Sequence, residues 1–216
     1  TDFYNPNNYE KISDALVSIS SSDGNSFILE ETQPGIYTSE NLTAFPNNEY
    51  SISVSYLENN YTAISKMPEG LILDSLTYEE GESRPFKDEV EYRFHCFFQD
   101  KPGVKEFARF KVYKNSKQIN GIFLYEDKLT DGSYIDFFRF PIHDEKIKKG
   151  DSLTFELLSI DKNIFNYFTT LGDALAESSS GPFGSQSPGN PTSNWSNDAF
   201  GYFSAYTVSS KTIVIK

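Results

Sequence analysis

The sequence predicts an all-β fold built from two antiparallel β-sandwich domains, the second with one short amphipathic helix and a long Ser/Gly/Pro loop. Short runs of alternating apolar and polar residues recur along the chain, and turn-forming residues separate them about every 8 to 12 residues. Only one segment has the 3.6-residue period of a helix. With 216 residues, 38% of them hydrophobic, the chain can bury a core in one large or two small domains.

The first domain is predicted over residues 1–67. Ala15, Val17 and Ile19 alternate with neighbours of the other face, the turn-forming residues 22–25 follow, and Phe27 resumes the alternation, which indicates a hairpin. The clearest period-2 run covers residues 50–56, and residues 61–65 continue it after a turn.

The second domain is predicted over residues 68–216. We place the boundary near Met67-Pro68-Glu69-Gly70, because Pro and Gly together interrupt both helix and strand. Further on, antiparallel strands are expected at 71–78, 90–98, 107–113, 122–125, 134–140, 153–160 and 207–215.

The helix is predicted over residues 162–176 and a loop over 178–197. Asp161 can cap the helix, since its carboxylate can accept hydrogen bonds from the amides two and three residues ahead. A stripe of apolar residues at helical spacing then follows, consisting of Ile164, Phe168, Leu171 and Leu175. The Ser/Gly/Pro-rich residues after it sustain neither regular period, and long loops of this kind often carry function.

Charge and composition exclude several classes of protein. The formal net charge is −12, which repels phosphate groups, so binding to nucleic acid or to anionic lipid is not expected. The single cysteine, Cys96, excludes an intramolecular disulfide and a multi-cysteine metal site. No stretch is long and apolar enough for a membrane-spanning helix.

Catalytic residues are not expected. His95 and His143 are the two histidines, and His95 lies within an apolar strand pattern, where a partly buried, hydrogen-bonded histidine is the common outcome. Cys96 would point to the opposite face of that strand, so the two cannot form a nucleophile pair, and Cys96 is expected to be buried.

The sequence gives no positive sign of a metal or cofactor. Glycoside hydrolysis by a pair of carboxylates stays open as a hypothesis, because acidic residues such as those at 79–82 and 144–145 are plentiful. Acidic runs beside Gly, however, are usually solvated turns. No loop has the alternating carboxylates that calcium requires. We therefore expect no catalytic residue, no metal ligand and no cofactor.

Exposed aromatic residues are the best candidates for a binding site. Aromatic residues make up 16% of the chain, and most should serve as core and cross-strand pairs. Phe183 and Trp195, however, lie within the Ser/Gly/Pro/Asn-rich loop, where they could anchor a partner or stack on a sugar, although Trp195 could instead plug the loop onto a sheet. The hypothetical binding residues are Phe183, Trp195, Asn190, Asn194 and Tyr202.

Two stretches carry a resemblance to known families. Residues 14–19 with Asp23-Gly24-Asn25 and Pro34-Gly35-Ile36-Tyr37 resemble the prealbumin-like or carboxypeptidase-regulatory-like sandwich, which has an immunoglobulin-like architecture. Residues 189–194 followed by 201–206 resemble the end of a family of Bacteroidota lipoproteins designated only as a domain of unknown function. The middle of the chain also fits that family, at 98–100, Asp127, 131–132 and 157–161.

The resemblance implies an outer-membrane, lipid-anchored protein that faces the cell surface or the periplasm. Such proteins are often encoded beside SusC-type TonB-dependent receptors, so the expected partner is an outer-membrane β-barrel protein, with a peptide or glycan as ligand. A targeting segment, a lipidated cysteine and opening strands are expected upstream of Thr1. In such an organism the short Asp-Ser-Leu patterns at 74–76 and 151–153 match an O-glycosylation motif.

The expected function is that of a non-enzymatic accessory or ligand-capturing subunit of an outer-membrane β-barrel complex, and the complex that we expect is a SusC-type TonB-dependent transporter. Two alternatives stay open: a structural subunit of an outer-membrane secretion or barrel-assembly machine, and a surface glycan hydrolase that uses two carboxylates.

Overall fold

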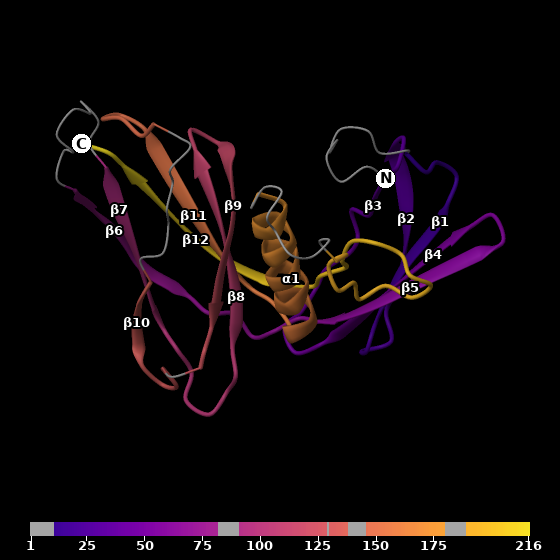
Figure 1. Cartoon of the computed structure of the whole chain (residues 1–216). Helices are drawn as coiled ribbons and strands as arrows, with labels where there is room; N and C mark the ends of the chain where they lie inside the picture. The colour runs from indigo at the N-terminus through magenta and orange to yellow at the C-terminus, as the bar shows by residue number, and fades with distance from the viewer. Residues whose placement is uncertain (1–10, 82–90, 129, 138–145, 180–188) are drawn as a thin grey trace.

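The computed structural model describes residues 11–81, 91–128, 130–137, 146–179 and 189–216. Within these residues the chain forms twelve β-strands and one α-helix, and the paired strands run antiparallel (Figure 1). The expected all-β class, with a single helix, is confirmed.

The first half of the chain forms one five-stranded sheet with the order β3-β2-β1-β4-β5. Its strands are β1 (Leu16–Ser21), β2 (Ser26–Gln33), β3 (Ile36–Thr38), β4 (Glu49–Tyr56) and β5 (Asn59–Lys66). The predicted hairpin joins β1 to β2, and Gly24 in its turn has φ +94°, a conformation that glycine adopts without a steric penalty.

The alternating sequence gives this sheet two different faces. Val17, Ile19 and Tyr50 are buried on one face, whereas the intervening positions on the other face are mostly serine, as in β1 and β4. The buried face packs on Met67 and on residues from two connecting segments rather than on a second sheet of the described chain. These covering residues are Leu42, Ala44, Phe203 and Ala205.

The second half forms two sheets that face each other. One has the order β10-β7-β6 and the other β12-β11-β8-β9. The strands are β6 (Leu73–Glu80), β7 (Tyr92–Gln99), β8 (Phe107–Lys114), β9 (Lys117–Glu126), β10 (Tyr134–Phe137), β11 (Ser152–Ser159) and β12 (Thr207–Val214).

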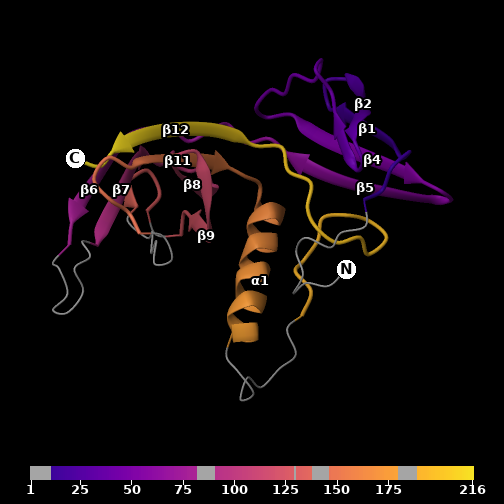
Figure 2. The same cartoon turned by 90° about the horizontal axis from the view of Figure 1, so that it is seen from above.

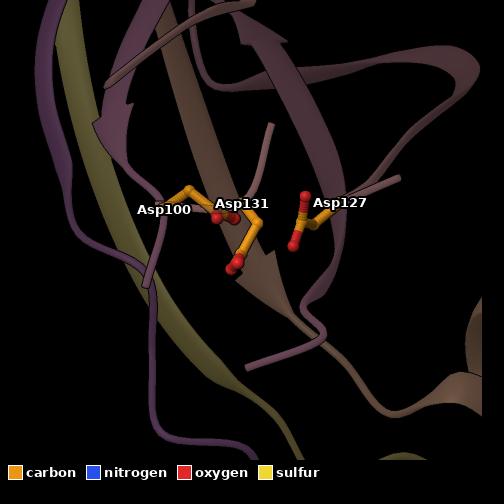
Figure 3. A group of neighbouring side chains, drawn as sticks. All are labelled: Asp100, Asp127 and Asp131. Atoms are coloured by element: carbon orange, nitrogen blue, oxygen red, sulfur yellow. The ribbon is translucent and has the colours of Figure 1, made fainter. Parts of the chain in front are cut away.

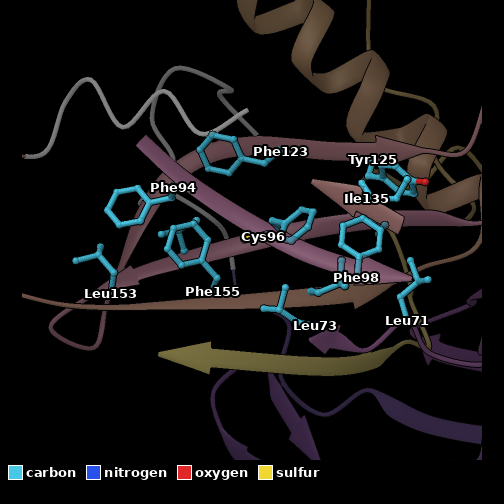
Figure 4. Packing of buried hydrophobic residues seen from close by; sticks show 14 of the residues in the cluster. Leu71, Leu73, Phe94, Cys96, Phe98, Phe123, Tyr125, Ile135, Leu153 and Phe155 are labelled. Atoms are coloured by element: carbon cyan, nitrogen blue, oxygen red, sulfur yellow. The ribbon is translucent and has the colours of Figure 1, made fainter. Parts of the chain in front are cut away.

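Aromatic side chains from both sheets fill the space between them (Figure 4). Phe94 of β7 meets Phe155 of β11 with ring centroids 5.2 Å apart, and Phe98 meets Tyr125 edge to face at 5.0 Å. Such tilted and edge-to-face contacts are favourable geometries for aromatic pairs. Cys96 lies in the same core, as expected, and burial raises the pKa of its thiol.

Helix α1 (Lys162–Ser179) covers the outer face of the four-stranded sheet and lies between the two β regions (Figure 1). The predicted stripe meets the sheet through Ile164 and Phe168, which are buried against Phe107 and Leu158. The helix extends three residues beyond its predicted end at 176, so the first two residues of the predicted loop 178–197 are helical.

Two segments of the chain run between its two halves. Residues 67–72 connect β5 to β6, at the position of the predicted domain boundary, which stays a prediction. Gly70 lies so close to β12 that an added Cβ would come within 2.6 Å of the Thr207 hydroxyl. Before β12 begins, residues 189–206 return to the side of β5 (Figure 2).

No helix in the described part of the chain is both long and apolar enough to cross a lipid bilayer.

Candidate ligand-binding pocket

A pocket of about 410 Å³ lies where the middle of β5, the first turns of α1 and residues 192–196 meet. Its volume falls within the range of roughly 300–1,000 Å³ that is typical of small-molecule sites. The pocket thus lies between the two halves of the molecule, where ligand sites are common. The lining residues are Thr62, Ala63, Ile64, Asn163, Asn166, Thr192, Ser193, Asn194, Trp195 and Ser196.

Asp161 positions the helical wall of the pocket. Its Oδ1 accepts hydrogen bonds from the amides of Asn163 (2.8 Å) and Ile164 (3.0 Å), which confirms the predicted helix cap. Its Oδ2 accepts a hydrogen bond of 2.5 Å from the Ser65 hydroxyl. Ser65 is buried in β5, and its oxygen also accepts the Ala205 amide at 3.0 Å. These bonds join β5, α1 and the C-terminal segment at one point.

The opposite wall is a short stretch of chain that pairs with β5. Trp195 forms an antiparallel bridge with Ala63. The Ser196 amide donates to the Thr62 carbonyl at 2.8 Å, and the Ser196 hydroxyl accepts the Thr62 amide at 2.8 Å. Backbone pairing therefore fixes the position of Trp195 at the pocket.

Two asparagine side chains complete this wall by bonding to backbone groups. The Asn194 amide donates to the carbonyls of Ile64 (3.1 Å) and Phe203 (2.7 Å), and its oxygen accepts the Phe203 amide at 2.9 Å. The Asn197 amide donates to the Asn60 carbonyl at 2.8 Å. The carbonyls of residues 60, 62 and 64, which point outward from β5, therefore all accept hydrogen bonds from this segment. The segment thus closes this edge of the sheet.

Other polar groups at the pocket make no hydrogen bond with any described residue. These are the side-chain amides of Asn163 and Asn166, the Thr192 hydroxyl and the indole N–H of Trp195. Asn163, Asn166 and Thr192 are exposed, and Trp195 is partly buried. The polar side chains of one wall thus form their hydrogen bonds within the protein, whereas the polar groups of Asn163, Asn166, Thr192 and Trp195 are available to a ligand.

The residues that line the pocket are all uncharged. The carboxyl groups whose pKa is lowered lie elsewhere. Hydrogen bonding lowers the pKa of each of them, chiefly from Ser21 for Asp23 and from the Asp14 amide for Glu31, and the same holds for Glu126 and Asp151. The lining therefore presents hydroxyl, amide and indole groups rather than charged ones.

Two of the five predicted binding residues line the pocket, namely Asn194 and Trp195. Asn194 stabilises the wall of the pocket rather than offering a ligand contact, because its side-chain amide donates its hydrogen bonds within the protein. The backbone of Trp195 fastens its segment to β5, as the plug interpretation expects, and the residue is partly exposed at the pocket, so its role as an anchor for a ligand stays a prediction.

The other three predicted residues do not line this pocket. Tyr202 packs against α1 and β8, with its ring centroid 4.7 Å from that of Phe168, and its hydroxyl accepts a hydrogen bond from Arg109 at 3.3 Å. Asn190 is exposed and lies outside the lining. Phe183 falls outside the described residues.

Sequence reasoning missed the residues that α1 and β5 contribute, above all Asn163 and Asn166. Their spacing of three residues directly after a capping aspartate places them on one polar face of the helix, which is the signal that could have identified them. Their proximity to Trp195 depends on the tertiary fold and has no local signature.

A separate cluster of carboxylates joins the loop after β7 to the loop between β9 and β10 (Figure 3). Oxygens of Asp100, Asp127 and Asp131 lie within 4.8 Å of one another and are the described groups that could hold a cation. Asp100 is fully buried and accepts the Gly132 amide at 2.8 Å, while Asp131 accepts the Gly103 amide at 2.6 Å. These bonds give the carboxylates a structural role in holding the turns together.

The one described histidine also has a structural environment. His95 is partly buried in β7, and its Nδ1 lies 2.9 Å from Asp136 Oδ1 on the neighbouring strand β10. This contact agrees with the expectation that His95 is a partly buried, hydrogen-bonded histidine of the strand. His143 lies outside the described residues, as do residues 82 and 144–145 of the acidic runs.

The two serines of the Asp-Ser-Leu patterns lie in regular structure. Ser75 is in β6 and Ser152 begins β11, and both are partly buried. Their modification stays a prediction.

Comparison with known proteins identifies a family for almost the whole chain. Residues 1–212 match the family described as Domain of unknown function (DUF4249). Searches of curated proteins and of solved structures gave no match to the chain.

Proposed function

We propose that this chain, which belongs to the DUF4249 family, is a non-enzymatic ligand-capturing subunit that holds a peptide or a glycan in the pocket between β5 and α1. The observation that carries the proposal is the difference in hydrogen bonding between the two walls of the pocket. One wall is rigid because its polar groups bond to the backbone of β5, whereas Asn163, Asn166 and Trp195 keep polar groups for a ligand.

The setting that we propose for this activity is the outer membrane. The resemblance of the sequence to Bacteroidota lipoproteins supports a lipid-anchored protein that serves a β-barrel complex, and the complex that we propose is a SusC-type TonB-dependent transporter. In that setting a captured ligand would be passed to the barrel, and the neutral pocket would hold it through hydrogen bonds and stacking that allow release.

Hydrolysis by two carboxylates is the alternative with a specific observation behind it. Burial raises the pKa of Glu106, and the neighbouring Asp100 carboxylate adds to this shift. A paired acid and base with one raised pKa is what a glycosidase requires. Asp100, however, is fully buried and bonded to Tyr125 and Gly132, so a substrate would have no access to it. We therefore favour capture.

Purification from native membranes tests the proposal. The tagged full-length protein, extracted in mild detergent, should carry with it an outer-membrane β-barrel protein identifiable by mass spectrometry. Isolation of the protein alone, or the release of reducing sugar ends from glycans in a way that depends on Glu106, would contradict it.

A further inference from the structure

We infer that the ligand of the pocket formed by β5, α1 and residues 192–196 is a neutral saccharide, with Trp195 as the contact for a sugar ring and Asn163 and Asn166 as its hydrogen-bond partners. This inference rests on the proposed function and names the ligand class for the same site.

Trp195 has the properties of a sugar platform. It lines the pocket, and no described aromatic ring stacks on it. An indole presents a large, flat apolar surface at low entropic cost and a polar N–H at its edge. A pyranose ring matches both features, since it has an apolar face of C–H groups and a rim of hydroxyls. Backbone pairing to Ala63 keeps the residue in place before a ligand arrives.

Asn163 and Asn166 match the hydroxyl rim of a sugar. They stand three residues apart on one face of α1, and each exposed amide offers a carbonyl acceptor and two N–H donors. A sugar hydroxyl both donates and accepts, so one amide can satisfy it in either role. The Thr192 hydroxyl adds a further partner at the same pocket.

Charge argues against acidic ligands. No lysine or arginine is among the lining residues, so a carboxylate or sulfate would be buried without a counter-charge, which is costly. The net charge of −12 on the chain adds long-range repulsion. Uronic acids and sulfated sugars are therefore disfavoured relative to neutral ones.

The closed edge of β5 argues against a peptide. Extended peptides commonly bind by adding a strand to an open sheet edge, where main-chain hydrogen bonds supply the affinity. At this pocket the carbonyls of Asn60, Thr62 and Ile64 already accept bonds from residues 194–197. A peptide would have to displace that segment, whereas a sugar needs only the unoccupied side chains.

The chain carries its own reporter for a test, because Trp195 is its only tryptophan. The purified protein is first applied to an array of neutral, uronic-acid-containing and sulfated glycans, and titrations then follow the Trp195 emission. We expect a saturable emission change with at least one neutral oligosaccharide and none with trigalacturonic acid or tetra-alanine.

Paired variants connect the emission change to the inferred contacts. The double variant N163A/N166A should weaken binding about tenfold or more, which corresponds to the loss of two ligand hydrogen bonds. Folding should be unaffected, since both side chains are exposed and alanine favours helix. N41A changes an exposed asparagine outside the pocket and should bind as the unmodified protein does.

Failure of this inference is distinguishable from failure of the proposed function. The saccharide inference is overturned if no neutral glycan binds, or if N163A/N166A binds with full affinity. If tetra-alanine or trigalacturonic acid instead gives a saturable response, capture stands with another ligand class. If no probe responds and the membrane preparation yields no barrel protein, both proposals fail.

Discussion

The sandwich core of the second half and the pocket at the junction are held together by different forces. Between β6, β7 and β10 on one side and the facing four-stranded sheet on the other, aromatic and aliphatic side chains are fully buried (Figure 4). At the junction, the contacts are hydrogen bonds between side chains and backbone, centred on Ser65, Asp161, Asn194 and Ser196.

This difference suggests a separation of stability from binding. Apolar burial is non-directional and scales with area, so a large core tolerates variation and supplies most of the free energy of folding. Hydrogen bonds contribute less net energy but fix positions closely. A site that must hold three segments in register around a neutral ligand is better served by the second kind of contact.

The largest expected effect comes from the core. Phe155→Ala removes a fully buried ring that packs on Phe94 and should lower the free energy of unfolding by about 3–5 kcal/mol, because it leaves a cavity. Urea denaturation followed by circular dichroism measures the change. Phe155→Leu is the control and should cost less. A loss below about 1 kcal/mol for the alanine variant would contradict the core's assigned role.

A smaller loss of stability is expected where β5, α1 and the C-terminal segment meet. Asp161→Ala removes the helix cap and leaves the buried Ser65 hydroxyl without its acceptor, so the free energy of unfolding should fall by about 2 kcal/mol. Asp161→Asn keeps an oxygen for the cap and should retain most of the stability. Equal losses in the two variants would show that the contribution of Asp161 is its charge rather than its hydrogen bonds.

Glu106, which neighbours Asp100, should make the stability of the protein depend on pH. Burial, reinforced by the neighbouring Asp100 carboxylate, raises the pKa of Glu106 above its usual value, although the Lys101 amide opposes this shift. The folded chain therefore holds this proton more tightly than the unfolded chain. The resulting stability is present below the ordinary glutamate pKa and is lost as pH rises towards the raised value.

Glu106→Gln isolates this effect, because the amide is neutral at every pH. Urea midpoints measured across the acidic range should show the unmodified protein losing stability relative to Glu106→Gln as pH rises through that interval. A constant difference between the two proteins would mean that Glu106 has the same pKa in the folded and unfolded chains.

The smallest effect on stability is expected at the ligand-facing side of the pocket. Asn166→Ala removes an exposed amide without a partner in the described chain, so the free energy of unfolding should change by no more than about 0.5 kcal/mol. Differential scanning calorimetry checks this, with Asn194→Ala as the matched wall variant. Asn194→Ala should be clearly less stable, since three bonds are lost. Similar melting temperatures for the two variants would contradict the division of the pocket walls.

Local patterns in the sequence were sufficient for most of the fold. The alternation at Val17 and Ile19, the period of Ile164 and Phe168, and the cap at Asp161 each depend on neighbours within a few residues, and each appears in the structure. The end of α1 was less predictable, because the residues after Leu175 carry no strong stop signal before Gly181.

The site was only partly predictable because its residues come together through long-range contacts. Trp195 was identified as an unusual aromatic in a Ser/Gly/Pro-rich segment, but nothing near it in sequence indicates Thr62 or Asn166. Likewise the carboxylates of Asp100, Asp127 and Asp131 are separated along the chain, so no local spacing revealed their cluster. Side-chain bonds to a distant backbone, such as that from Asn194 to Ile64, have no sequence period.

The most direct test follows the side-chain N–H resonances of the isotope-labelled protein by NMR while the neutral oligosaccharide selected on the array is added. The amides of Asn163 and Asn166 and the indole N–H of Trp195 should shift progressively and saturate together. The Asn194 amide should shift little, because its hydrogens already bond to Ile64 and Phe203. Shifts confined to residues outside the pocket, or unchanged Asn163, Asn166 and Trp195 resonances at saturating sugar, would contradict a ligand site at this junction.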